Sequence, residues 1–263
     1  MKSTLDQIED IRKNGYSLDF SNVFNHAFEN YKKIALYAGL ILLVFSILAF
    51  FLGGGLLVAL YGVEHFNKQF FENLQTQQTE NSVLLIYTLV IAVVAAFLSP
   101  FTAGFIKMAD CADKDEAFNV STIFSYYTSR HFANLFIAAL SISLLGGLIS
   151  VAFNLIGIMF VDTIITVVIT LFTTLTIPLI IFGDLNAVDA IKSSVTIVSK
   201  QPFVILLLII VGGLASMVGF IGCCIGIVFT IPITYSVNYA IYRAIILTDD
   251  NEDSIDSIGQ SDL

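Results

Sequence analysis

Six long runs of apolar residues divide the chain, and each is long enough to cross a membrane. They cover 34–61, 83–108, 133–160, 163–182, 203–221 and 223–246. A helix needs about 20 apolar residues to span a hydrocarbon layer of about 30 Å. The alternative is a count of five spans with 203–246 unbroken, but Gly219 and Gly222 favour a tight turn between the last two runs.

The composition points to the same class of protein. Hydrophobic residues make up 57% of the 263 residues, charged residues only 13%, and the mean hydropathy is +0.87. An average soluble domain has about 45–50% apolar and about 25% charged residues. These values exclude a disordered chain and an ordinary soluble enzyme. The net charge of −9 also argues against a nucleic-acid partner, because such binding needs a basic face.

The distribution of basic residues predicts the orientation. In a six-span chain only Lys68 lies in the odd-numbered connections, and the other Lys and Arg fall on the opposite side: Lys2, Arg12, Lys13, Lys32, Lys33, Lys107, Lys114, Arg130, Lys192, Lys200 and Arg243. Because basic loops stay in the cytoplasm, we expect an inner-membrane protein with both termini cytoplasmic. The first apolar run begins only near Ile34, which predicts an uncleaved anchor rather than a signal peptide.

A pattern that occurs three times precedes the odd-numbered runs. Asp19, Asn119 and Asn186 can each cap a helix N-terminus. Apolar residues then recur at helical spacing, most completely from Phe20 to Tyr31. The sequence therefore predicts an all-α polytopic bundle of three hairpins, each preceded by an amphipathic helix at the cytoplasmic interface.

The even-numbered runs share a different feature, which is one internal proline each: Pro100, Pro178 and Pro232. A proline inside a helix removes one backbone hydrogen bond and kinks the helix. Two interpretations remain open, a static kink that sets the shape of the bundle and a hinge that moves.

Close helix packing is predicted where small residues cluster in the apolar runs. The glycines concerned are Gly53–Gly55, Gly146–Gly147, Gly212–Gly213 and the series Gly219, Gly222 and Gly226. Small residues let helix backbones approach each other in a membrane. We give Cys223 and Cys224 the same packing role.

Little catalytic chemistry is expected. His26 and His131 fall on the cytoplasmic side and His65 on the other, so no metal or cofactor site is predicted and no catalytic residue is assigned. The spans themselves are almost free of charge, with Asp162 at the expected turn between spans three and four. The neutral Asn154, Asn238 and Tyr235 are expected to form interhelical hydrogen bonds.

Arg243 ends the sixth span in a Tyr-Arg pair. An arginine at that depth can extend its side chain to lipid phosphates, and we predict that contact. The alternative is an ion pair with a cytoplasmic carboxylate such as Asp184 or Asp189.

The chain divides into a cytoplasmic N-terminal segment (1–17), one membrane domain (18–247) and an acidic tail (248–263). The tail holds six acidic residues and no Lys or Arg. Such a segment repels itself and is expected to be disordered in the cytoplasm. It is either inert or a docking site for a basic protein partner.

Three stretches carry a resemblance to a known family: Ser99–Gly104, Ile177–Ser194, and Gly222 through Pro232 to Arg243. They are similar to uncharacterised bacterial six-span proteins and to the membrane domain fused to some glycerophosphoryl diester phosphodiesterases. Bacteroidota members of this group are often labelled beta-carotene monooxygenase, which the chemistry of this chain does not support. In the fused relatives the catalytic residues lie in a separate soluble barrel, so none can be assigned here.

The leading functional hypothesis is a non-enzymatic integral membrane protein, either lipid-interacting or a scaffold component of the cell envelope, with membrane lipids as partners. The alternative is a permease or channel subunit for a small or lipidic solute. The spans carry few of the buried charges that ion-coupled transporters use, which counts against active transport.

Overall fold

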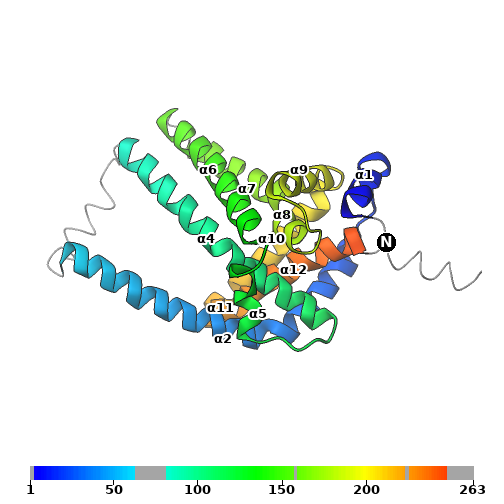
Figure 1. The fold of residues 1–263 in the computed structure, drawn as a ribbon, viewed down its shortest axis with the longest axis horizontal. Helices are drawn as coiled ribbons and strands as arrows, with labels where there is room; N and C mark the ends of the chain where they lie inside the picture. The colour runs from blue at the N-terminus through cyan, green and yellow to red at the C-terminus, as the bar shows by residue number, and fades with distance from the viewer. Residues whose placement is uncertain (1–2, 63–80, 157–158, 223–224, 248–263) are drawn as a thin grey trace, which may run out of the picture.

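The computed structural model describes residues 3–62, 81–156, 159–222 and 225–247, and within these ranges it contains helices but no strand. Six helical segments are long and apolar enough to cross a membrane, which confirms the predicted span count and the all-α class. They are Phe20–Leu56, Leu84–Asp113, Phe132–Phe153, Thr163–Ile181, Pro202–Ile221 and Ile225–Ile246. The spans converge at one end of the molecule and spread toward the other (Figure 1).

The first span belongs to α2 (Phe20–Tyr61), which is one continuous helix of 42 residues. The predicted amphipathic stretch and the predicted span are therefore a single element of about 63 Å at 1.5 Å per residue. No proline or turn interrupts the junction near Ile34, so the helical hydrogen bonds simply continue from the polar part into the apolar part. The Asp19 side chain caps the start of α2 by accepting a hydrogen bond from the Asn22 backbone at 2.7 Å.

The second amphipathic stretch is shorter than its pattern suggests. Asn119 caps α5 (Val120–Phe124), a helix of only 5 residues that continues as the 3₁₀ turn η2 (Ser125–Tyr127). The third stretch forms α9 (Ala187–Val198), a full helix capped by Asn186. Thus all three side chains act as N-caps, but only α9 is a separate amphipathic helix of more than two turns.

Consecutive spans do not all pack as pairs. The second span, in α4 (Asn81–Asp113), packs mainly along α6 (Phe132–Ile156). The first span instead contacts α12 (Pro232–Tyr242) and α11 (Ile225–Thr230), which together form the sixth. Beyond their common end α2 and α4 diverge (Figure 1). The predicted hairpins are therefore correct as chain connections. In the folded protein, however, the first span packs mainly against the sixth span and not against the second.

The predicted turn position of Asp162 falls within a helix. α6 ends at Ile156 and α7 (Met159–Thr173) begins three residues later, so Asp162 lies inside a helix.

The fifth span, in α10 (Pro202–Met217), is followed by the 3₁₀ segment η3 (Val218–Gly222), which leads toward the sixth span. Cys223, Cys224, residues 63–80 and the acidic tail lie outside the described residues.

The N-terminal segment contains a helix that the sequence patterns did not predict. α1 (Thr4–Asn14) starts with a capping box between Ser3 and Asp6 and buries Ile8 and Ile11. It packs against α9 (Figure 1). Just after it, the Tyr16 hydroxyl donates to the Ile197 carbonyl at 3.1 Å, and burial raises the pKa of this phenol. The segment is therefore an integral part of the fold.

Two of the three internal prolines coincide with breaks between helices. Pro178 lies in α8 (Thr176–Ile181), which follows α7 after a short turn, and Pro232 is the first residue of α12. Pro100 lies within the continuous helix α4. A proline cannot donate to the carbonyl one turn earlier, so partners from other segments are needed nearby.

Hydroxyl groups from other segments donate to carbonyls close to these prolines, although not to the carbonyl four residues before each proline. The Tyr127 hydroxyl donates to the Phe97 carbonyl at 2.9 Å, close to Pro100, and the Tyr31 hydroxyl donates to the Phe229 carbonyl at 3.1 Å, close to Pro232. At the break before Pro178, the Ser194 hydroxyl donates to the Phe172 carbonyl and accepts from the Leu175 backbone N–H. Side chains of neighbouring segments thus add hydrogen bonds beside each proline, of the kind that tolerates irregular helices in membranes.

The glycines differ in what surrounds them. A Cβ on Gly104 would overlap the backbone of Ile123 in α5, and one on Gly219 would overlap the backbone of Gly226. These close approaches require glycine. By contrast, no described atom lies within 4 Å of a Cβ built on Gly53, Gly54, Gly55 or Gly213, so the predicted packing role of these four is wrong within the described structure.

We expect Gly104→Ala to destabilise the protein by about 1–3 kcal/mol, the usual cost of forcing an extra methyl group into a packed site. Gly213→Ala is the matched control, because a Cβ there meets nothing within 4 Å. Thermal unfolding of the purified variants in detergent measures both. Equal midpoints for the two variants would contradict the assigned contact between α4 and α5.

Candidate functional site

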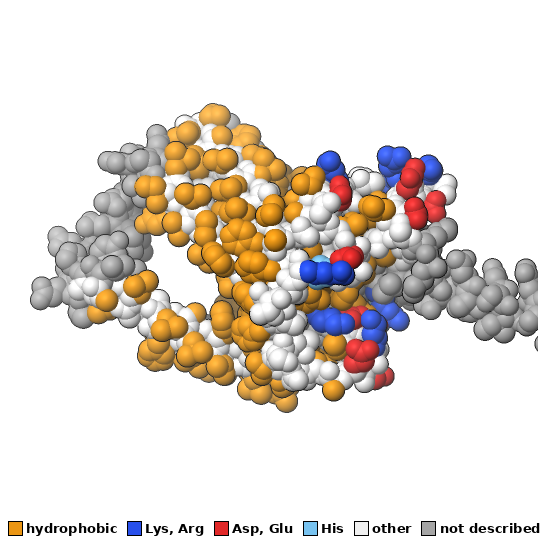
Figure 2. Space-filling view, viewed as in Figure 1, with side chains coloured by type: hydrophobic (Ala, Val, Ile, Leu, Met, Phe, Trp, Pro, Cys, Tyr) orange, Lys and Arg blue, Asp and Glu red, His pale blue; other side chains and the backbone are white. Residues whose placement is uncertain are grey.

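The end at which the spans converge carries the charged side chains that are visible in Figure 2, and we call it the charged end. It combines the N-terminal part of α2, the C-terminal ends of α4 and α12, and the helices α1 and α9 (Figure 1). Hydrophobic side chains (orange in Figure 2) cover most of the remaining described surface in this view. Two features near this end are candidates for function, a network of paired charges and an apolar groove.

Asp110 is the most deeply buried acid in the network, with only 1% of its surface exposed. Its carboxylate lies 2.6 Å from the Lys107 ammonium and 2.8 Å from the Lys114 ammonium. These lysines stand three residues before it and four after it, so all three side chains share one face of α4. The Tyr239 hydroxyl of α12 donates a third bond at 3.1 Å. A buried carboxylate is tolerated only with such partners.

Asp113, one turn further along α4, joins three helices. Its carboxylate lies 2.7 Å from Nε2 of His26 in α2 and 3.0 Å from Nε of Arg243. The Tyr239 hydroxyl lies 3.0 Å from it and shares its single proton between Asp113 and Asp110. Nε2 of His26 also lies 2.9 Å from Nη1 of Arg243. One nitrogen cannot donate to the acid and accept from the guanidinium at once, so the tautomer of His26 decides which of the two bonds forms.

Neutral side chains extend the network into the bundle. The Asn30 amide donates to the Ala109 carbonyl at 2.7 Å, and its oxygen accepts from the Ser236 hydroxyl at 2.9 Å. Both side chains are buried, and they link α2, α4 and α12. Near the surface, Lys33 bonds to the Ala112 carbonyl and to Asp115. The network therefore fastens the first, second and sixth spans together.

A second, more exposed pair connects the third and fourth spans. Arg130 donates to Asp184 at 2.9 Å, and His131 lies 3.7 Å from the same carboxylate. Exposed ion pairs contribute little to stability. Beside His131, burial raises the pKa of the Tyr126 phenol, which keeps this side chain neutral.

Arg243 has a different acidic neighbour from those considered in the sequence analysis. The carboxylate beside it is Asp113, whereas Asp184 pairs with Arg130 and Asp189 bonds to Asn186. Its side chain is still 42% exposed. A contact between Arg243 and lipid phosphate stays a prediction.

Asp110 and Asp113 were not predicted as site residues because the predicted second span ends at 108. α4 continues to Asp113, so both acids belong to the spanning helix. The signal that could have revealed them is the spacing of Lys107, Asp110 and Lys114, which places one acid between two bases on a helix face.

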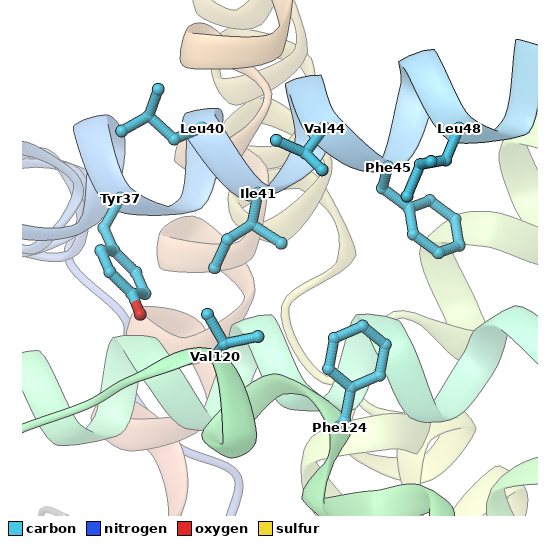
Figure 3. A pocket seen from close by; sticks show the side chains of 8 residues that line it. All are labelled: Tyr37, Leu40, Ile41, Val44, Phe45, Leu48, Val120 and Phe124. Carbon is cyan, nitrogen blue, oxygen red and sulfur yellow. The ribbon is translucent and has the colours of Figure 1, made fainter.

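The apolar groove lies between α2 and α5, beside the charged end. Its volume is about 420 Å³, and Figure 3 shows side chains of α2 directed toward Val120 and Phe124 of α5. The α2 wall includes Tyr37, Ile41, Val44 and Leu48, which recur at helical spacing on one face. The lining is carbon except for the Tyr37 hydroxyl.

Some buried polar atoms have no hydrogen-bond partner among the described residues. They include the hydroxyls of Ser99 and Thr176 and the amide oxygen of Asn238. Asn238 thus lacks, at this oxygen, the interhelical bond that the sequence analysis expected. These three residues lie on α4, α8 and α12, the segments that carry the internal prolines.

No cluster of three or more potential metal ligands exists in the part of the chain that the structure describes. No family model, curated protein or solved structure matches this chain. The resemblance to the phosphodiesterase membrane domains therefore stays a prediction, and function must be argued from the geometry alone.

We expect Asp110→Ala to lower the free energy of unfolding by about 2 kcal/mol or more, because it removes hydrogen bonds to two charged partners. The control is Asp184→Ala, which removes an exposed pair and should cost less than about 1 kcal/mol. Thermal or denaturant unfolding in detergent compares them. A loss at Asp184 as large as that at Asp110 would refute the structural importance of the buried network.

Proposed function

We propose that this protein is a non-enzymatic, lipid-interacting component of the cell envelope, located in the inner membrane with both termini in the cytoplasm. Six candidate spans make it an integral membrane protein in contact with lipid. The proposed lipid-interacting role rests on the surroundings of the charged side chains and of the apolar groove. A catalytic site needs charged groups directed at a cavity, whereas here they pair with one another.

The observation that carries the proposal is the contrast between the network and the groove. Asp110 and Asp113 are each matched by cations and by the Tyr239 hydroxyl, so they act in holding helices together. The groove is lined by apolar side chains and lies along a membrane-spanning helix, where lipid is the surrounding medium. This arrangement favours contact with lipid chains over chemistry on a polar substrate.

The proposal predicts that the protein is surrounded by a selected set of lipids. The test is to extract it from membranes in polymer-bounded discs and to compare the lipids of those discs with the lipids of the whole membrane. We expect enrichment of at least one phospholipid class. A composition equal to that of the bulk membrane, and to discs of an unrelated six-span protein, would contradict the proposal.

A permease for a small solute is the second candidate, and one specific observation favours it. Ser99, Thr176 and Asn238 each hold a buried polar atom without a partner among the described residues, and each lies on a span with a proline. Unpaired polar atoms in a membrane protein are costly, and a passing polar solute could supply the missing bonds.

The second candidate predicts passage of an uncharged polyol. Vesicles that contain the protein should swell faster in glycerol than empty vesicles, as measured by light scattering after osmotic shock. Asn238→Leu should abolish the difference, while Leu207→Ala, at an exposed position of α10, should preserve it. Equal rates with and without protein would remove this candidate and leave the lipid proposal in place.

A further inference from the structure

The groove between α2 and α5 has the shape of a binding site for one lipid chain. Its α2 wall runs from Tyr37 to Leu48, three turns of one helix face, or about 16 Å at 1.5 Å per residue. Val120 and Phe124 form the opposite wall, and the Phe124 ring is directed toward α2 (Figure 3). The groove is thus a long apolar trough between two elements that are far apart in sequence.

The position of the groove identifies its occupant. It is formed largely by a helix that crosses the membrane, and Val44 and Leu48 on its wall are more than half exposed. Within the bilayer the molecules that cover such surface are lipids, whose chains are as apolar as the leucine side chain. An open trough parallel to the helix accepts an extended acyl chain along its length, and it provides no polar atom for a peptide backbone except at its end.

The end of the groove nearest the charged end has groups that suit a lipid headgroup. The Tyr37 hydroxyl has no hydrogen-bond partner among the described residues, and Figure 3 shows it directed away from α2 at this end. Lys33 lies one helical turn before Tyr37 on the same face of α2. Its ammonium is about half exposed and pairs with Asp115, itself highly exposed, so a phosphate can compete for it.

We propose that the groove binds one acyl chain of a phospholipid from the leaflet adjoining the charged end, with its phosphate near Lys33 and the Tyr37 hydroxyl. This inference rests on the proposed lipid-interacting function and adds the site and the ligand class. A basic side chain at a membrane surface attracts anionic lipid, so the preferred ligand is an anionic phospholipid.

The experiment measures lipid retained by the full-length protein. Purified protein is incubated with palmitoyl-oleoyl phosphatidylglycerol in mild detergent, washed, and examined by native mass spectrometry. We expect the wild type to retain one lipid and Val44→Trp, which fills the groove, to lose it. Val90→Trp is the matched control, since Val90 is a valine of α4 with similar exposure, 52% against 57%, outside the groove.

The headgroup contact is tested separately. Lys33→Gln should weaken retention about fivefold, the change that corresponds to one basic side chain at a membrane surface. Lys32→Gln should leave retention unchanged, because Lys32 pairs with Glu29 elsewhere on α2. Unfolding midpoints equal to that of the wild type establish that each variant is folded. Equal effects of the two lysine variants would overturn the placement of the phosphate.

The possible failures can be told apart. If the lipid stays bound to Val44→Trp, or if the retained species has the mass of a free fatty acid, the groove assignment is wrong. In either case an enriched lipid class in the polymer discs would still support the proposed function. If neither retention nor enrichment is seen, both proposals fail.

Discussion

The fold depends on the burial of two carboxylates at the C-terminal end of α4. Withdrawing a carboxylate from water costs several kcal/mol unless a partner of opposite charge and further hydrogen bonds replace the lost solvation. Asp110 finds two of its partners on α4 itself, but Asp113 depends on His26 of α2 and on Arg243 after α12. The single hydroxyl proton of Tyr239 is shared between the two acids. The requirement to satisfy these charges therefore fixes where the first, second and sixth spans meet, and it makes the last span close the bundle against the first.

The same constraint explains why the spans can separate at the opposite end. In water, the exposed faces of α2 and α4 would be driven together by the hydrophobic effect, whereas in lipid that driving force between helices is absent. Once the charged end is fastened, the apolar halves gain only packing contacts by approaching each other. The divergence of α2 from α4 is thus compatible with a stable bilayer protein (Figure 1). It also leaves room beside α5 for the groove, and lipid replaces the side chains that would fill such a space in a soluble protein.

Much of the architecture could be predicted from the sequence because membrane insertion leaves a strong periodic signal. The six spans and the capping residues follow from hydropathy and from short-range hydrogen bonding. The site could not be predicted in the same way. Asp113 looks like a loop residue until its tertiary partners His26 and Arg243 are known, and these lie more than 80 and more than 120 residues away in the chain. The partners of Asp110 on α4 are local, but their spacing does not show that the carboxylate is buried. The packing role predicted for Gly53–Gly55 was wrong for a different reason. A pattern of small residues shows that two helices could approach each other closely, but not that they do. α1 was missed because it is short and its apolar face is covered only in the folded protein.

Each copy of the threefold capping pattern also carries a hydroxyl group that forms a hydrogen bond near a proline-containing span. Tyr127 and Ser194 each lie eight residues after their caps, Asn119 and Asn186, and each donates a hydroxyl bond to a carbonyl of the proline-containing span that precedes it in the chain. In the first copy the eighth position is Ala27, and Tyr31, about one helical turn later, bonds instead to Phe229 of the sixth span. A displacement of one turn keeps the donor on the same face of α2. Each copy therefore places one hydroxyl group beside a proline-containing span, and the bond from Tyr31 joins the first and sixth spans at a second point, apart from the charged network.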